Sequence, residues 1–294
     1  MSGIKPPKPA APPQTQKAAK ASDLTDVRDV IRGAIASVFG FGGRLIARVM
    51  LMVLAGRAFG IEALGHLGQI AAICEILAAL SILGLKRSLL DMLSFDDKHG
   101  RAPERRITEA AGLVLTISAV LSGVMMFVWP ILFPDLIAGH PTLLIALFIV
   151  IPCYALADTL LSAIKFKRVI KWDVWARAMI EPWGFLGLAI LTYMIGLKSG
   201  GLIYAYAGSV LLAVATAATG LIRVYGAKPL AASKPKLRSW PAIIAQCAPV
   251  GITDAGIMML RRLDMVVLSL FVGPAGAGLY YMVQQLATVP QKVN

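Results

Sequence analysis

Residues 110–133 read AAGLVLTISAVLSGVMMFVWPILF, a stretch of 24 residues that contains no charged side chain. A helix rises about 1.5 Å per residue, so about 20 apolar residues span the roughly 30 Å hydrocarbon core of a bilayer. Charge-free stretches of similar length occupy 199–222 and 265–291. Three such stretches predict a chain that crosses a membrane several times.

The composition of the whole chain indicates the same class of protein. Apolar residues make up 57% of the 294 residues and charged residues 15%, and the mean hydropathy is +0.73. Soluble domains average about 45–50% apolar and about 25% charged residues. The three cysteines, Cys74, Cys153 and Cys247, form no CxxC pair and predict neither a disulfide framework nor a zinc site. We therefore predict an all-α polytopic membrane protein without a metal or cofactor.

About eight transmembrane helices are expected once runs with a polar end or a few internal charges are included. They lie at about 34–58, 67–85, 108–130, 141–163, 174–196, 200–222, 243–271 and 276–292.

The segment before the first span has a different composition. Residues 1–22 contain five prolines, four lysines and no acidic residue, which predicts a disordered cytoplasmic arm. No apolar core of signal-peptide length follows the early lysines. In 23–33, apolar residues recur at helical spacing between charged ones. This pattern indicates an amphipathic helix on the membrane surface or, alternatively, a solvated helical lead-in.

The net charge of +13 could indicate either nucleic-acid binding or membrane topology, and the positions of the charges decide between them. Of the 29 Lys and Arg residues, 22 are predicted on one side of the membrane: in the N-terminal segment, in the connections on that side or after the last span. Only Arg57 and Lys198 are predicted on the other side. By the positive-inside rule the N-terminus is cytoplasmic. We expect attraction to anionic membrane lipid and no nucleic-acid partner. The remaining five basic residues lie inside spans: Arg44, Arg48, Arg177, Arg261 and Arg262.

A weak internal repeat relates the first and seventh spans. An offset of 213 residues superposes Gly60 on Gly273, Gly65 on Gly278 and Arg48 on Arg261. In each copy a long apolar helix with an arginine precedes a glycine-rich turn and another apolar helix. The repeat predicts a first six-helix lobe at 34–225, a cytoplasmic linker at 226–240 and the start of a second lobe at 241–294.

Three local features carry a resemblance to a known family: the turn GIEALG at 60–65, the run LGLKRSLL at 83–90, and Arg262-Leu263-Asp264 ahead of Gly273. Together they resemble Wzx-type oligosaccharide flippases of the multidrug/oligosaccharidyl-lipid/polysaccharide (MATE-like) exporter superfamily. The resemblance covers about residues 30–294. It implies two six-helix lobes around a cavity that opens alternately to either face of the bacterial inner (cytoplasmic) membrane.

The resemblance also implies a function in polysaccharide export, including that of lipopolysaccharide. Members carry polyprenyl-pyrophosphate-linked oligosaccharide from the cytoplasmic to the periplasmic leaflet. The lipid-linked oligosaccharide is then the partner, together with polysaccharide polymerase and glycosyltransferase machinery, and a second copy of the chain is a further candidate partner. Because only one lobe and the first two helices of another are expected, the chain is interpreted as a C-terminally truncated member.

Charged residues inside spans are the candidate site, because ionisable groups at membrane depth are costly and commonly functional. Arg44 and Arg48 lie one helical turn apart, and Glu75 on the next span reaches a similar depth. Arginine stays ionised and binds phosphate oxygens in pairs. We therefore expect Arg44 and Arg48 to bind pyrophosphate, with Glu75 holding one arginine in the empty site. A purely structural ion pair between the two spans is the alternative.

The other intramembrane charges form two further groups. Arg177, Glu181 and Asp158 are expected to form a network, for which a structural role is favoured, although Arg177 is also a candidate pyrophosphate ligand. The resemblance would place Arg261 across the cavity from Arg48, and Arg262 is expected to pair with Asp264. The candidate counter-ions, or coupling sites for a proton or sodium ion, are Glu75, Asp158, Glu181 and Asp254.

Two other functions stay open. A membrane enzyme acting on polyprenyl-linked sugars would need a large extramembrane loop with paired carboxylates, whereas the longest outer connection covers only about 131–140. The acidic residues Asp91, Asp96 and Asp97 are interpreted as a solvated loop. An inactive or partner-dependent membrane scaffold is the other alternative. We expect a transporter without catalytic residues.

Overall fold

The computed structural model describes residues 42–132, 142–197, 200–233 and 235–287. These residues are largely helical and contain no strand, and six of their helices are long and apolar enough to cross a membrane. The prediction of an all-α polytopic membrane protein is therefore confirmed. The predicted arm at 1–22, the lead-in at 23–33 and the ends of the first and last predicted spans lie outside the described residues.

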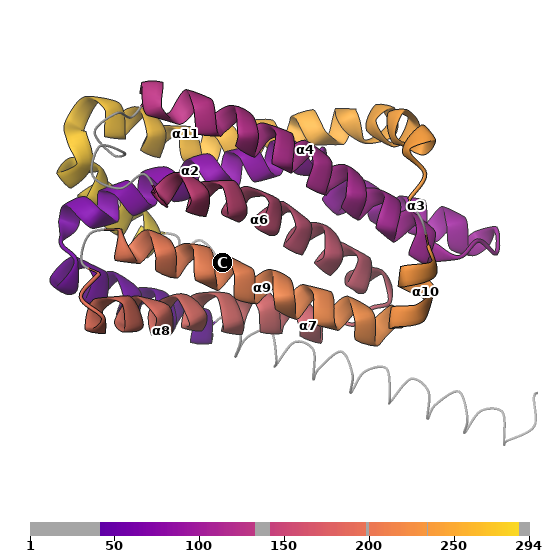
Figure 1. The fold of residues 1–294 in the computed structure, drawn as a ribbon, viewed down its shortest axis with the longest axis horizontal. Helices are drawn as coiled ribbons and strands as arrows, with labels where there is room; N and C mark the ends of the chain where they lie inside the picture. The colour runs from indigo at the N-terminus through magenta and orange to yellow at the C-terminus, as the bar shows by residue number, and fades with distance from the viewer. Residues whose placement is uncertain (1–41, 133–141, 198–199, 234, 288–294) are drawn as a thin grey trace, which may run out of the picture. The chain divides into compact units, whose positions relative to one another are not determined.

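The described helices form a bundle in which successive long helices run in opposite directions (Figure 1). Neighbouring pairs are α4 with α6, α6 with α9, and α9 with α8, while α2 packs against both α6 and α11. Each of the eight predicted spans falls on a helix, with α11 supplying both the seventh and the eighth. The elements are a helix over 42–58, α2 (Ile61–Ile82), α3 (Leu85–Lys98), α4 (Pro103–Leu132), α6 (Thr142–Phe166), α7 (Lys171–Asp173), the π-helix η1 (Val174–Ile180), α8 (Glu181–Met194), α9 (Gly201–Tyr225), α10 (Ala227–Ala232), the 3₁₀ turn η2 (Leu237–Ser239) and α11 (Trp240–Ala287).

Two glycines break the helices at equivalent points of the predicted repeat. Gly60 has φ 91° and ψ 165° between the helix over 42–58 and α2, and Gly273 has φ 78° and ψ 177° inside α11. Only glycine adopts this backbone conformation without strain. Gly273 therefore divides α11 into two helical segments. The same conformation at positions 213 residues apart supports the repeat read from the sequence.

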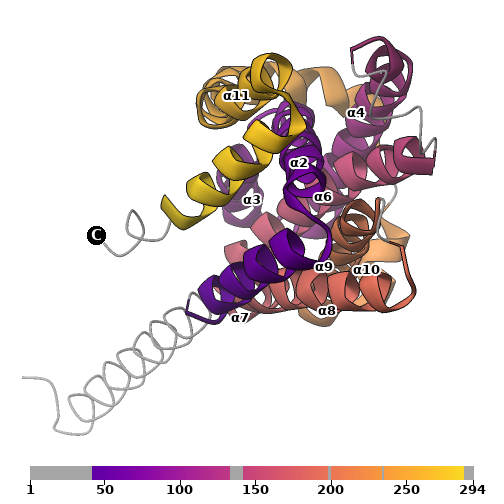
Figure 2. The same cartoon turned by 90° about the vertical axis from the view of Figure 1, so that its left-hand side faces the viewer.

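The contact between α2 and the second segment of α11 is reciprocal. A Cβ atom at Gly65 would overlap the carbonyl oxygen of Pro274, and one at Gly278 would overlap the carbonyl oxygen of Ile61. Pro274 follows Ile61 by the repeat offset, so each segment offers the equivalent carbonyl to the equivalent glycine. The two segments thus pack about a local two-fold axis, side by side (Figure 2).

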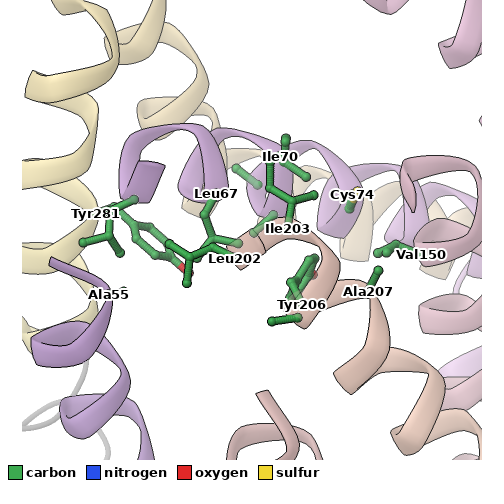
Figure 3. Close-up of a cluster of buried hydrophobic side chains, with 14 of the residues drawn as sticks. Ala55, Leu67, Ile70, Cys74, Val150, Leu202, Ile203, Tyr206, Ala207 and Tyr281 are labelled. Atoms are coloured by element: carbon green, nitrogen blue, oxygen red, sulfur yellow. The ribbon is translucent and has the colours of Figure 1, made fainter. Parts of the chain in front are cut away.

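The bundle holds together through two clusters of closely packed side chains. In a bilayer the surroundings of a helix are as apolar as its neighbours, so association depends on close van der Waals packing. One cluster joins Leu67 and Ile70 of α2 to Leu202, Ile203 and Tyr206 of α9 (Figure 3). The other surrounds the buried face of α3 and includes residues of α4, α6 and α9. Both clusters are rich in alanine, which allows close approach of the helix backbones.

The solvated loop predicted around Asp91, Asp96 and Asp97 is wrong, because this segment is the helix α3. Its buried face includes Leu89 and Leu93, which pack in the second cluster. Asp96 is buried and accepts a hydrogen bond from Arg106 at 3.0 Å. The segment is an amphipathic helix whose apolar side faces the bundle, and its acidic residues suggested a loop instead.

The basic residues gather at the end of the bundle where α3 and α10 lie, here called the α3 end (Figure 1). At the opposite end, Arg57, near the end of the helix over 42–58, is the one basic side chain among the described residues. The one-sided distribution read from the sequence is therefore present in the described bundle. Its members at the α3 end are Lys86, Arg87, Lys98, Arg101, Arg105, Arg106, Lys165, Lys167, Arg168, Lys171, Arg223, Lys228, Lys236 and Arg238.

Candidate functional site: two charged cavities

Five of the predicted site residues line one cavity, here called the inner cavity. Its volume is about 60 Å³, room for a few water molecules. The helix over 42–58, α2, η1, α8, α9 and the second segment of α11 all contribute to its wall. The lining residues are Arg44, Arg48, Leu51, Met52, Ala71, Glu75, Arg177, Glu181, Pro182, Phe185, Tyr206, Ser209, Tyr281 and Gln285.

Arg44 and Arg48 project into the inner cavity from successive turns of the same helix. Both are half-buried, and neither forms an ion pair within the part of the chain that the structure describes. A guanidinium group keeps its charge at any physiological pH and carries five donors in a planar fork. The inner cavity therefore presents two cationic forks that are available to an anion.

Arg177 differs from these two arginines because it is fully engaged. It donates a hydrogen bond to Glu181 at 2.7 Å and another to Asp158, and its guanidinium stacks on Tyr154 at 4.2 Å from the ring centroid. Asp158 also accepts a hydrogen bond from Lys86 at 3.2 Å. The predicted Asp158–Arg177–Glu181 network is confirmed, with Lys86 as a fourth member that the sequence did not indicate.

A local irregularity of the helix carries Arg177. Pro182 has no amide hydrogen, so it cannot bond to the carbonyl of Ala178 as a regular α-helix requires. The chain before it forms the π-helix η1, and α8 begins at Glu181. Wide turns of this kind often occur at functional sites. The irregular segment places Arg177 and Glu181 together on the wall of the inner cavity.

The predicted pairing of Glu75 with Arg44 or Arg48 is wrong. Glu75 lines the same cavity as both arginines, but its carboxylate pairs with Arg262 of α11 at 2.7 Å. The expected Arg262–Asp264 pair is also wrong, because Asp264 instead accepts hydrogen bonds from Tyr280 and Gln284. Arg262 lies close enough to Glu75 because α11 packs along α2, a contact that sequence spacing cannot indicate.

A second, larger cavity, here called the mouth, lies at the α3 end. Its volume is about 450 Å³, and four basic side chains line it: Lys86, Arg87, Lys165 and Arg261. The resemblance would place Arg261 opposite Arg48 in one cavity, but Arg261 lines the mouth and Arg48 the inner cavity. The acidic residues that line the mouth are Glu75, Asp158 and Asp254.

Charged side chains separate the two cavities. Glu75 lines both of them. Arg177 lines the inner cavity and stacks on Tyr154, which lines the mouth. Together the two cavities are lined by seven basic and four acidic side chains, so an excess of positive charge extends from the α3 end into the bundle.

Sequence reasoning missed polar residues that complete the inner cavity, notably Tyr206, Ser209 and Tyr281. The hydroxyl of Tyr206 is buried and has no hydrogen-bond partner among the described residues. An unsatisfied buried hydroxyl is costly, so its position on a cavity wall suits a ligand. Its side chain comes from α9, within the apolar cluster of Figure 3. Within an apolar span, no pattern distinguishes such a tyrosine from an ordinary packing residue.

The described residues contain no group of three or more His, Cys, Asp and Glu side chains arranged to hold a metal ion. The chemistry that the two cavities offer is electrostatic. Fixed guanidinium and ammonium groups are suited to an anion, and the hydroxyl groups beside them are suited to further hydrogen bonds.

Comparison with known proteins gives a family and no close relative. The model of a family described as "Polysaccharide biosynthesis protein" matches residues 30–293. Comparisons with curated proteins and with solved structures find no significant match. The family match covers almost the whole chain, including every helix that lines the two cavities. The chain therefore belongs to the polysaccharide biosynthesis protein family.

Proposed function

We propose that this protein is a flippase of the bacterial inner membrane, of the Wzx type within the MATE-like exporters. It moves a polyprenyl-pyrophosphate-linked oligosaccharide from the cytoplasmic to the periplasmic leaflet and performs no covalent chemistry. Membership of a polysaccharide biosynthesis family supports the substrate class. The polytopic bundle with a charged inner cavity supports transport.

The observation that carries this proposal is a pair of arginines in the inner cavity that form no ion pair among the described residues. An arginine at membrane depth normally pairs with an acid, as Arg177 and Arg262 do here. Arg44 and Arg48 retain their charge without an ion-pair partner among the described residues. Pyrophosphate carries several negative charges on oxygens that match the planar fork of a guanidinium. The two arginines thus suit the headgroup of the proposed substrate.

The proposed orientation follows from the distribution of basic residues. The α3 end is cytoplasmic, because it carries the connections rich in Lys and Arg. The mouth then opens toward the leaflet in which the lipid-linked sugar is made. At about 60 Å³ the inner cavity is smaller than a pyrophosphate-linked sugar requires, so the helices around it must move apart when the substrate binds.

In the empty state, two acidic residues on the cavity walls form ion pairs with arginines. Glu75 and Glu181 line the inner cavity, and each holds the guanidinium of another residue. When the anionic headgroup arrives, it competes with these carboxylates. A proton or sodium ion taken up by Glu75, Asp158, Glu181 or Asp254 would then couple transport to a gradient. Polysaccharide polymerase and glycosyltransferases are the proposed neighbours in the pathway.

A cellular export assay tests the proposal. In a strain that depends on this protein for its surface polysaccharide, Arg44→Ala with Arg48→Ala abolishes export while the protein stays in the membrane. Arg57→Ala is the matched control, because Arg57 lies on the same helix but outside the inner cavity. Normal export by the double variant would refute the assigned role of the two arginines.

A further inference from the structure

The mouth contains basic side chains whose partners come from other helices. Lys86 pairs with Asp158 of α6 at 3.2 Å, and Arg87 pairs with Asp254 of α11 at 3.4 Å. Arg261 also lines the mouth and forms no ion pair within the described ranges. Of the four basic side chains that line the mouth, Lys86 and Arg87 are therefore paired with carboxylates that also line it, whereas Arg261 is not.

Of these contacts, the Arg87–Asp254 pair connects α3 to α11, and it is here called the latch. The side chain of Arg87 is 70% exposed, and the two groups lie 3.4 Å apart, beyond the usual length of a charge-assisted hydrogen bond. An exposed ion pair of this kind contributes little stability, so a stronger anion can replace the carboxylate. Gly84 and Gly251 make a close backbone contact three residues before each partner of the latch.

A second ion pair holds the same two regions together deeper in the bundle. Glu75 of α2 pairs with Arg262 of α11, and Glu75 lines both cavities. The seam between α2–α3 and α11 is thus closed by the latch at the mouth and by Glu75–Arg262 next to the inner cavity. The carboxylates of both ion pairs therefore line the mouth, and that of Glu75 also lines the inner cavity.

We propose that the mouth is a separate binding site for a pyrophosphate headgroup, which replaces Asp254 on Arg87 and so releases α3 from α11. Lys86 and Arg261 hold the same headgroup from the two sides of the seam. This inference rests on the proposed function, because it names the site at which the lipid-linked substrate is held before it reaches Arg44 and Arg48. The latch then acts as a sensor of the occupied mouth.

Binding measurements on the purified full chain in lipid nanodiscs test this site. The probe is geranylgeranyl pyrophosphate, and inorganic pyrophosphate and geranylgeraniol report the headgroup and the lipid tail separately. All variants carry Arg44→Ala and Arg48→Ala, so that the inner cavity does not contribute to the measured affinity. We expect the lipid pyrophosphate to bind more tightly than inorganic pyrophosphate, and geranylgeraniol not to bind.

The direction of the effects distinguishes a binding site from a structural ion pair. Arg87→Ala and Arg261→Ala are expected to weaken probe binding about tenfold each, since each removes one charge-assisted contact to phosphate. Asp254→Asn is expected to tighten it about threefold or more, because it removes the competing carboxylate. Arg101→Ala is the matched control and is expected to leave binding unchanged. The Arg101 side chain is 63% exposed, follows the C-terminal end of α3 and lies outside the mouth.

Several results would overturn the proposal. The first is loss of all probe binding in the Arg44→Ala, Arg48→Ala background. Two others are binding of geranylgeraniol as tight as that of the lipid pyrophosphate, and tighter binding of inorganic pyrophosphate than of the lipid pyrophosphate. The last is weaker probe binding when Asp254→Asn is added to the background. The first of these would leave the proposed function intact. Conversely, binding that follows the expected order, together with a wild-type chain that does not transport the lipid, would refute the proposed function alone.

Release of the latch has its own measurement. Spin labels at Asp91→Cys of α3 and Ile252→Cys of α11, both exposed positions, report the distance across the seam after the native cysteines are replaced. The probe is expected to shift the distance distribution to longer values, and Asp254→Asn to produce the same shift without probe. An unchanged distribution with saturating probe would contradict the release of α3 from α11.

Discussion

At the scale of single residues, the arginines at membrane depth fall into two groups with different partners. Arg177 and Arg262 are held by carboxylates, whereas Arg44 and Arg48 face a cavity without an ion pair among the described residues. A buried charge that has lost its partner is strongly destabilising. Removing one member of the first group therefore destabilises the bundle, whereas the second group offers cations that an anionic ligand can pair with.

This difference predicts opposite effects on stability. Arg177→Ala leaves Asp158 and Glu181 without their shared partner and is expected to lower the free energy of unfolding by about 3–5 kcal/mol. Arg44→Ala removes a cation that has no ion-pair partner in the described part of the chain, so it is expected to leave stability unchanged or to increase it. Thermal unfolding of both variants in the same detergent measures the difference. Equal losses of stability would show that Arg44 has a structural partner.

Tyr206 provides a second prediction at this scale. Its buried hydroxyl lines the inner cavity without a partner among the described residues, so Tyr206→Phe is expected to leave the melting temperature unchanged. If the hydroxyl binds the headgroup, transport falls about tenfold, the effect of one hydrogen bond to a charged group. Tyr225→Phe is the control, because that hydroxyl donates to the carbonyl of Ala163 at 2.7 Å outside both cavities. Full transport by Tyr206→Phe would exclude Tyr206 from binding.

The candidate site was predictable from sequence at the level of which residues share a cavity. Arg44, Arg48 and Glu75 could be placed at one depth because helical rise is constant. The partner of Glu75 could not be predicted, because Arg262 approaches it from α11, far along the chain. Arg261 was assigned to the wrong cavity for the same reason. The helical rise determines the depth of a residue in the membrane. Which residues of two helices far apart in sequence face each other depends on how the helices pack.

At the scale of the helices, the contact of α2 with α11 organises both cavities. Gly65 and Gly278 allow the two backbones to touch, and residues of both helices line the inner cavity and the mouth. Small residues at such a crossing are the usual means of close helix packing in membranes. Because this crossing is reciprocal, each glycine is equally necessary.

A pair of glycine substitutions tests this crossing. Gly278→Ala would drive a methyl group into the carbonyl oxygen of Ile61 and is expected to lower the free energy of unfolding by about 1–3 kcal/mol. Gly187→Ala in α8 meets open space and is expected to raise it by about 0.5–1 kcal/mol, because alanine favours a helix. Denaturation in detergent compares the two variants. A neutral Gly278→Ala would mean that the helices do not approach so closely.

The helices themselves were predictable to different degrees. The apolar spans were located by length and hydropathy, because the bilayer requires both. The helix α3 was missed because Asp91, Asp96 and Asp97 suggested a loop, although its other side is apolar. The π-helix η1 was also missed, since Pro182 marks an irregularity without specifying its form. Local polarity misleads where one face of a helix packs and the other is solvated.

At the scale of the whole molecule, the charges, the cavities and the family are each consistent with the proposed transport of an anionic lipid. Basic connections gather at the α3 end, the mouth opens there, and the excess of positive charge continues to Arg44 and Arg48. The chain belongs to a polysaccharide biosynthesis family. The proposed substrate unites these observations, because its pyrophosphate headgroup is the anion and its polyprenyl tail stays in the lipid.

Lipid translocation by the purified full chain in proteoliposomes tests the central claim most directly. A fluorescent polyprenyl-pyrophosphate lipid is incorporated into both leaflets, and a membrane-impermeant quencher reports the fraction that reaches the outer leaflet. Wild type and Arg57→Ala are predicted to make nearly all of the lipid accessible, and Arg44→Ala with Arg48→Ala to match protein-free vesicles. Accessibility above the level of protein-free vesicles with the double variant, or accessibility no higher than that level with wild type, would contradict a flippase that works through these two arginines.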